Sequence, residues 1–277
     1  MTQYGVFLPN LGPFADARAL SDLAARAESA GWDGFFVWDH VLFDAESRLD
    51  VVDPWIALAA IALATERVRI GALMTPISRR RPWKLARETT SLDQLSGGRL
   101  ILGAGLGFPA DAEFELFGEY SEDRVRAARL DEGLEVLAGL WTEERYVHHG
   151  EHFEVGPVTF TPRPVQQPRP PVWIAGWWPN KAPYRRAARW DGVVPELVGG
   201  SQPGIDDVRA ISDFITEQRG SIGGFDIVLN GHDVLSRPDL DDFASAGVTW
   251  WLERCDPDRG FSVAEAEAII DRGPQGS

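Results

Sequence analysis

The chain has 277 residues, of which 44% are hydrophobic, so it can bury a sizeable core in one large domain or two ordinary ones. Acidic residues outnumber basic ones by 42 to 27, and the net charge of −15 argues against nonspecific binding to nucleic acid or to an anionic membrane. The single cysteine, Cys255, excludes an internal disulfide and a cysteine metal cluster.

The start of the sequence enters a strand pattern directly, without the basic segment of a signal peptide. The longest apolar run, 55–64, is too short to span a bilayer. We therefore expect a cytoplasmic protein that does not bind membranes.

Strand and helix patterns alternate through the first half of the chain. Short apolar strands are expected at 4–9, 34–40, 69–76 and 99–107. Helix-start signals follow them at Asp16, Asp53-Pro54, Pro82 and Ser121. The third helix is expected to end at Gly97-Gly98, because glycine suits the left-handed residue that terminates a helix.

A proline-rich excursion at 146–170, with a small hairpin, interrupts this alternation. The pattern then resumes with strands expected at 172–175, 192–198, 225–229 and 248–254. The intervening helices are expected at 183–190, about 206–219 and about 240–246, and Ser262 with Glu265 forms a capping box for a last helix.

Eight strand–helix units with wholly apolar strands predict a parallel sheet covered by helices, and a closed (β/α)8 TIM barrel is the simplest arrangement. A doubly wound open sheet is the alternative, but the unit count and the lack of a dinucleotide-binding glycine loop argue against it. No linker or internal repeat is evident, so residues 1–277 are interpreted as one domain carrying the excursion before its fifth strand.

Three alternate glycines, Gly103, Gly105 and Gly107, end the fourth strand. A strand without side chains lets a flat ligand approach its backbone, but such glycines can also only relieve crowding at a barrel corner. The glycines alone do not separate these two interpretations.

Barrel enzymes place their site at the carboxyl ends of the strands, and several polar and aromatic residues are expected there. These are Asp39-His40, Thr75-Pro76, Gly176-Trp177-Trp178, Asn230 to Asp233, and Glu253-Arg254. The set fits a flat aromatic cofactor better than a sugar or a metal. His40 is the leading catalytic candidate, because imidazole exchanges protons near neutral pH, and Asp39 is a candidate to orient it or hold a cofactor edge. A structural Asp–His pair is the alternative.

Four motifs make the sequence recognisable: 92–107, Trp38-Asp39-His40, 70–76 and 170–176. In their order along the chain and in their spacing, they resemble the bacterial luciferase-like family of flavin- and deazaflavin-dependent oxidoreductases. The resemblance implies that Asp39 contacts the cofactor, that His40 is catalytic or lies over its ring, and that a non-prolyl cis peptide at Ala72-Leu73 lies behind it. The further cofactor contacts that it implies are Thr75, the backbone of Gly105, Leu106 and Gly107, and Gly176 and Trp177 near the phosphate; Trp178 joins this set as an aromatic neighbour.

Some positions depart from the family pattern. The sugar-phosphate dehydrogenases of the family carry a Trp and a Glu where this chain has Asp44 and Phe108, which argues against sugar-phosphate oxidation. Asp111 and Glu113 lie nearby, but their expected place is an exposed turn.

Basic residues after the third and fifth strands provide a candidate rim for an anionic cofactor tail, although a solvated loop or helix face is the alternative. They are Arg79, Arg80, Arg81, Lys84 and Lys181, with Arg185, Arg186 and Arg189 further on. His148, His149 and His152 lack a recognised metal-ligand spacing, so no metal site is expected, and Cys255 is interpreted as a packed thiol.

The resemblance and the site residues favour an oxidoreductase that moves a hydride between coenzyme F-420 and a small organic substrate. An FMN- and O2-dependent two-component monooxygenase is the alternative, NADPH is the least favoured cofactor, and a non-catalytic flavin-binding protein is an alternative of another class. The helix expected at 55–64 is apolar on every face, which predicts a homodimer interface, with cover by a loop of the same chain as the alternative.

Overall fold

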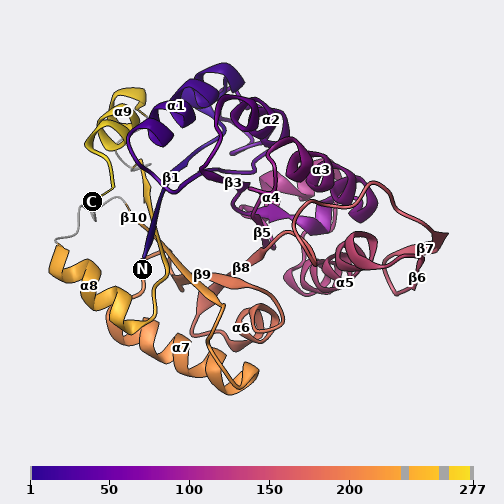
Figure 1. Cartoon of the computed structure of the whole chain (residues 1–277). Coiled ribbons are helices and arrows are strands. Elements are labelled where there is room, and N and C mark those ends of the chain that lie inside the picture. The colour runs from indigo at the N-terminus through magenta and orange to yellow at the C-terminus, as the bar shows by residue number, and fades with distance from the viewer. Residues whose placement is uncertain (1, 232–236, 256–261, 275–277) are drawn as a thin grey trace.

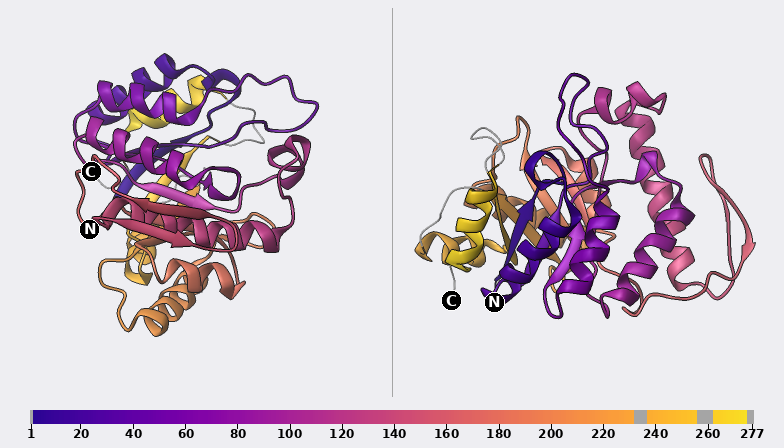
Figure 2. Two further views of the ribbon diagram at one scale, coloured as in Figure 1. Left: turned by 90° about the vertical axis from the view of Figure 1, so that its right-hand side faces the viewer. Right: turned by 90° about the horizontal axis from the view of Figure 1, so that it is seen from above.

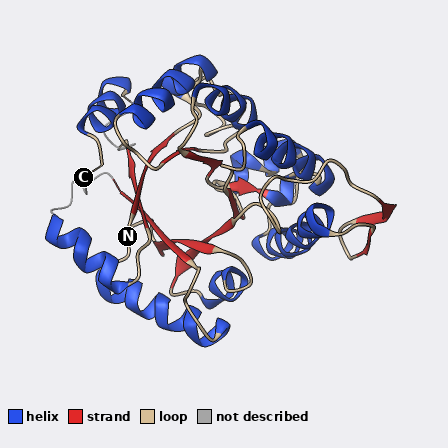
Figure 3. Cartoon of the chain, viewed as in Figure 1, coloured by secondary structure: helices blue, strands red, loops and turns tan. Residues whose placement is uncertain are grey.

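A computed structural model describes residues 2–231, 237–255 and 262–274. Within these ranges, nine parallel strands form a nearly closed barrel inside a layer of helices (Figures 1 and 3). The strands are β1 (Gln3–Leu8), β2 (Gly34–Val37), β3 (Arg69–Ala72), β4 (Thr75–Pro76), β5 (Leu102–Gly105), β8 (Val172–Trp178), β9 (Gly192–Leu197), β10 (Asp226–Gly231) and β11 (Trp250–Arg254). The expected TIM barrel is confirmed.

β3 and β4 together occupy one strand position of the barrel, and Leu73 and Met74 interrupt the strand between them. The peptide between Leu73 and Met74 is cis, one residue later than the expected Ala72-Leu73. β3 meets the segment before β5 through an Ile70–Leu100 bridge, whereas β4 pairs with β5 directly. The backbones approach so closely here that a Cβ on Gly71 would lie 2.0 Å from the carbonyl oxygen of Ile101. Glycine is therefore required where the barrel closes.

Alternation along the strands separates two cores. A large cluster lies between the strands and the helices. A second cluster fills the barrel itself and consists of Phe7, Phe36, Leu73, Ile101, Trp173, Val194, Val228, Trp250 and Leu252. Trp38 and Met74 pack on this inner cluster and are partly exposed. The barrel is therefore a filled core.

The longer helices are α1 (Ala17–Ser29), α2 (Pro54–Ala64), α3 (Pro82–Leu95), α5 (Asp123–Thr142), α7 (Ile205–Arg219), α8 (Arg237–Ala246) and α9 (Val263–Arg272). The caps expected at Asp16 and Asp53 form, since each carboxylate accepts two backbone N–H groups. Ser262 accepts the N–H of Glu265. The prediction for Ser121 was wrong: α5 begins one residue later, after Glu122, and has no side-chain cap.

Shorter elements lie among the loops. They are α4 (Ala110–Glu113), α6 (Lys181–Ala187) and the 3-10 turns η1 (Gly12–Phe14), η2 (Ile77–Arg79) and η3 (Glu115–Phe117). η2 follows β4, and α4 and η3 follow β5. These segments therefore lie at the carboxyl ends of their strands.

The excursion contains an antiparallel hairpin of β6 (Tyr146–His149) and β7 (Glu154–Val158), which projects beyond α5 (Figure 2). Glu132 of α5 anchors it by accepting the backbone N–H groups of His152 and Phe153 and contacting the ring of His148. The hairpin is thus held against the outside of the barrel.

α2 carries an apolar face on its outer side. Ile56 and Leu63 lie two turns apart and are 65% and 74% exposed, respectively, whereas Leu58 and Ile61 are buried in the core. No described helix has the length and apolar character needed to cross a bilayer.

Candidate functional site

His40 follows β2 at the carboxyl end of the barrel, and its backbone is fixed by a neighbouring strand. The side chain of Asn10, just after β1, donates to the carbonyl oxygen of His40 over 2.9 Å and accepts its N–H over 3.2 Å. Asn10 is fully buried. It therefore holds His40 at a fixed position relative to β1 and β2.

The ring of His40 is held by Glu113, which lies 73 residues away in sequence. Nδ1 of His40 is 3.0 Å from Oε1 of Glu113, and the same oxygen accepts the N–H groups of Val41 and Leu42. The other oxygen of Glu113 contacts the guanidinium of Arg79. A carboxylate with these donors acts as an acceptor, so Nδ1 of His40 donates.

His40 is neutral at physiological pH. Its pKa is lowered to about 4, mainly because burial disfavours the charged ring and also because Arg79 is cationic, while Asp39 partly opposes the shift. A neutral imidazole that donates through Nδ1 has a bare Nε2. His40 can therefore accept a proton at Nε2 while Glu113 holds its orientation.

Asp39 is bound by two arginines and does not contact the His40 ring. Oδ1 of Asp39 lies 2.9 Å from Arg79 and 2.7 Å from Arg80, and Oδ2 lies 2.8 Å from Arg80. Burial lowers the pKa of Arg79 to about 10, which leaves it cationic. Asp39 therefore belongs to a buried ion network, and Glu113 takes the orienting position considered for Asp39 in the sequence.

The expected basic rim is largely absent. Arg79 and Arg80 are committed to Asp39, and Lys84 pairs with Glu88 on α3. Nζ of Lys181 lies 3.3 Å from the centre of the Trp178 ring. Arg81 is exposed beside Trp83. Further on, Arg185 and Arg189 are exposed, as expected of a solvated helix face, whereas Arg186 is buried and binds Asp131 of α5.

The neighbouring strand ends, at β4 and β5, combine close packing with one unsatisfied polar atom. The hydroxyl of Thr75 is buried and has no hydrogen-bond partner. A Cβ on Gly105 would lie 3.2 Å from Met74 and 3.3 Å from Ala175, and Gly107 has a φ of +86° against Phe114. The glycines thus serve protein packing, and Thr75 is the group that still lacks a partner.

Ala72 ends β3 and Leu73 follows it, and their side chains lie on opposite sides of the barrel wall. Leu73 belongs to the inner core and Ala72 to the outer one. Leu106 follows β5 and is partly buried. Gly176 packs against α6, where a Cβ would lie 2.7 Å from Pro183.

The two tryptophans of β8 face opposite sides of the strand. Trp177 is 44% exposed, and its ring centre lies 6.1 Å from that of the exposed Phe108 in an edge-to-face arrangement. Its indole N–H donates to the carboxylate of Glu196 over 3.3 Å. Trp178 is buried in the outer core, with its ring centre 4.9 Å from that of Tyr184. The sequence analysis predicted that both rings lie at a cofactor. Because β8 continues to Trp178, the alternation of side chains along the strand directs the second ring toward the helices.

The remaining candidate polar groups differ in burial. Glu113 was expected on an exposed turn but is buried, whereas Asp111 is exposed as expected. Among the described residues no cluster suits a metal ion, and burial raises the pKa of the Cys255 thiol to about 12. His232 and Asp233 lie outside the described residues.

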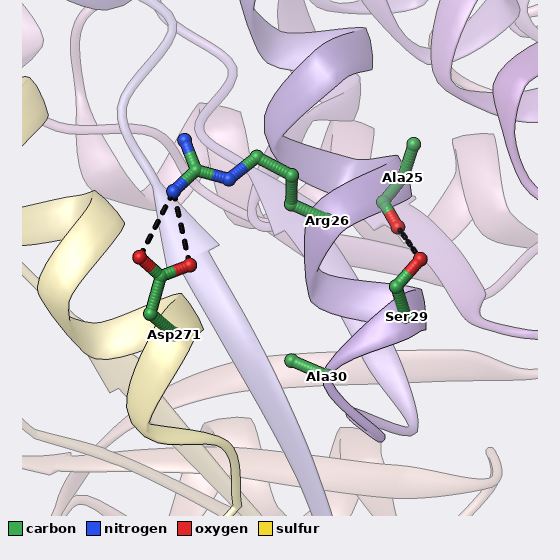
Figure 4. Close-up of a pocket in the computed structure, with 5 residues that line it drawn as sticks. All are labelled: Ala25, Arg26, Ser29, Ala30 and Asp271. Carbon is green, nitrogen blue, oxygen red and sulfur yellow. Dashed lines mark hydrogen bonds and ion pairs between the residues drawn. The ribbon is translucent and has the colours of Figure 1, made fainter.

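A surface hollow of about 430 Å³ lies between α1 and α9, away from His40 (Figure 4). Arg26 lines it and is bonded to both oxygens of Asp271, and it also pairs with Glu267. Because its charged groups are already paired, the hollow offers no reactive group, and His40 remains the centre of the candidate site.

Comparisons with known proteins agree on one family. Residues 2–235 match the family described as luciferase-like monooxygenase. An uncharacterized protein of Mycobacterium tuberculosis is 31% identical over 97% of this chain and 96% of its own length. An F-420-dependent glucose-6-phosphate dehydrogenase of Amycolatopsis mediterranei is 37% identical over 64% of this chain and 53% of its own length.

Two solved structures share the fold. The monooxygenase RslO1 from Streptomyces bottropensis is 28% identical with a TM-score of 0.69, over 89% of this chain and 75% of that one. An F-420-dependent secondary alcohol dehydrogenase, in complex with an F-420–acetone adduct, has a TM-score of 0.75 over 98% of this chain and 99% of that one at 17% identity.

The lowered pKa of His40 gives a prediction that needs no substrate. In ¹⁵N-histidine NMR spectra, His40 should titrate with a midpoint of about 4, with its proton on Nδ1 at neutral pH. His40→Asn identifies the signal. Between pH 6.5 and 4 the imidazole is protonated in the unfolded chain but not in the folded one. The contribution of His40 to the free energy of unfolding should therefore be fully present above pH 6.5 and should be lost as the pH falls toward 4. A midpoint near 6.5 in the folded protein would contradict the assignment.

Proposed function

Because the chain belongs to the luciferase-like monooxygenase family, we propose that it is an oxidoreductase that transfers a hydride between coenzyme F-420 and a small organic substrate. The observation that carries the proposal is the neutral His40, held through Nδ1 by the buried Glu113 at the carboxyl end of the barrel. A neutral imidazole with a bare Nε2 suits the proton transfer that accompanies oxidation of an alcohol.

The residues present fit a flavin-like cofactor. Thr75 has a buried hydroxyl without a partner, and it is in register with Ala104, the residue before Gly105. Trp177 offers an exposed indole face on the adjoining part of the barrel. The residues that would hold the cofactor are Asp39, Leu73, Thr75, Gly105, Leu106, Gly107, Gly176 and Trp177. When bound, F-420 would accept or supply the hydride.

In the direction of substrate oxidation, Nε2 of His40 accepts the proton of the substrate hydroxyl. Glu113 keeps Nδ1 protonated and stabilises the positive charge that then forms on the ring. Arg79 opposes that charge, so the ring releases the proton readily. In the reverse direction the same nitrogen returns the proton to the reduced carbonyl.

The F-420 assignment is supported by the dehydrogenases with which this chain shares 35–37% identity over about two thirds of its length. The basic residues after β4 give the F-420 assignment little support, because Arg79 and Arg80 bind Asp39 and are not available to an anionic cofactor tail. An FMN-dependent monooxygenase is the second candidate, favoured by the 28% identity with RslO1. Both candidates are enzymes, and loss of all turnover with either cofactor would favour a binding protein instead.

Substitutions at His40 and Glu113 test the proposed chemistry. Turnover would be followed as the loss of F-420 absorbance with a panel of alcohols. His40→Asn should lower kcat by about 10²- to 10⁴-fold while cofactor affinity is retained, because the proton acceptor is lost. Glu113→Gln should lower kcat by about 10- to 100-fold, because the ring is no longer held in one tautomer.

Asp111→Asn is the matched control, since Asp111 lies on the same helical turn as Glu113 but is exposed. It should leave kcat unchanged. Equal effects of Glu113→Gln and Asp111→Asn would show that Glu113 does not act on His40, and a fully active His40→Asn variant would move the proton transfer elsewhere.

We also propose that the exposed apolar face of α2 is a homodimer interface. Ile56 and Leu63 expose side chains that a second copy of the chain would cover. The variant Ile56→Asp/Leu63→Asp should be monomeric by light scattering at micromolar concentration, whereas the wild-type chain should be dimeric. Val147→Asp, which changes an apolar residue exposed on the hairpin, should remain dimeric. A monomeric wild-type protein would refute the interface.

A further inference from the structure

Arg254 ends β11 and extends from the inner face of the barrel. Along this strand Trp250 and Leu252 belong to the inner core, whereas Trp251 and Cys255 belong to the outer one. Glu253 points outward as well, where it pairs with Arg272 of α9. Side chains alternate along a strand, so Arg254 is directed to the same side as Leu252. It therefore lies at the carboxyl end of the barrel interior.

Within the described ranges 2–231, 237–255 and 262–274, the guanidinium of Arg254 has no partner. The residue is half-buried, its Nε is buried without a hydrogen bond, and no ion pair joins it to another described residue. The other buried arginines differ, because each is bonded to carboxylates or backbone carbonyls; they are Arg79, Arg80, Arg99, Arg126 and Arg186. A partly desolvated cation without a partner is costly in a folded protein. In a chain of net charge −15, it marks a place for an anion.

A continuous row of side chains connects Arg254 with His40. β11, β1 and β2 are neighbours in the sheet, and Arg254 is in register with Phe7. The ring of Phe7 lies 6.2 Å from that of Trp38, which lies 5.5 Å from the ring of His40. Two strand spacings, about 10 Å, separate the strands that carry Arg254 and His40. The surface between the two polar residues is aromatic.

The described carboxylates at this end of the barrel are committed to other groups. Asp39 is bound by Arg79 and Arg80, and Glu113 by Arg79 and His40. Glu196, on the inner side of β9, accepts the indole N–H of Trp177. Among the described residues, no carboxylate is therefore left for Arg254, and a bound molecule can supply the anion.

We propose that Arg254 binds the carboxylate of the substrate, whose apolar body lies over Phe7 and Trp38 and whose reacting carbon lies at His40. This inference rests on the proposed function, because it extends the same site to its substrate class. A planar guanidinium matches a carboxylate in a two-point contact. A doubly charged phosphate would need a second cation, and the neighbouring Arg79 and Arg80 are already neutralised. The substrate class is thus a small organic acid with an aromatic or aliphatic body.

Two probes of the same shape test the proposal on the cofactor-free protein. Benzoate and benzamide differ in charge, and their binding would be measured by calorimetry. Wild-type protein should bind benzoate more tightly than benzamide, and the benzoate affinity should fall as salt is added. Arg254→Gln should weaken benzoate binding by about 10- to 100-fold without changing benzamide binding. Arg254→Lys should be intermediate, because it keeps the charge and loses the two-point contact.

Arg185→Gln is the matched control, since it removes the same charge from an exposed position in the last turn of α6. It should bind both probes as the wild type does. The proposal is overturned if wild-type protein binds benzamide as tightly as benzoate or binds neither, or if Arg254→Gln and Arg185→Gln behave alike. It is also overturned if Arg254→Gln weakens F-420 binding instead of benzoate binding. Because these titrations require no hydride transfer, they stand or fall separately from the proposed reaction.

Discussion

Two buried carboxylates, on Asp39 and Glu113, share one buried cation, the guanidinium of Arg79. Removing any one of these charges would leave another without compensation in a low-dielectric environment. The network fixes the end of β2, the turn η2 and the single-turn helix α4 relative to one another. It also contributes to the chemistry of His40, because burial lowers the pKa of the ring, Arg79 lowers it further, and Glu113 holds Nδ1. The network therefore fixes the position of the candidate base and adds to the effect of burial on its protonation state.

The barrel supplies this network with its geometry. Trp38 packs on the inner core, and the chain beyond it carries Asp39 and His40 to the barrel end. Alternation then divides each later strand into an inner and an outer set, which directs Trp177 and Arg254 to the interior side and Trp178 and Glu253 to the helices. Residues adjacent in sequence consequently have unrelated roles.

Local signals in the sequence predicted much of the fold. The periodicity of the strands, the caps at Asp16 and Asp53 and the glycines at 97 and 98 each depend on a few neighbouring residues, and the structure contains all of them. The pairing of His40 with Glu113 could not be predicted in this way. It joins segments that are 73 residues apart, and it depends on α4 directing Glu113 into the protein interior. The candidate role of Arg79 and Arg80 in binding an anionic cofactor tail was wrong for the same reason. An arginine that follows a strand gives no sign in the sequence of the distant carboxylate that it binds. The position of His40 at a strand end was, by contrast, deducible from the motif and the barrel rule.

We propose that a deazaflavin binds at the carboxyl ends of these strands, against Trp177. Fluorescence titration of the cofactor-free protein with F-420 and with FMN tests it most directly. We expect tighter binding of F-420, with quenching that is largely lost in Trp177→Phe and retained in Trp178→Phe. Trp177 is 44% exposed, whereas Trp178 is 7% exposed and lies in the outer core. Tighter binding of FMN, or quenching that survives in Trp177→Phe, would contradict it.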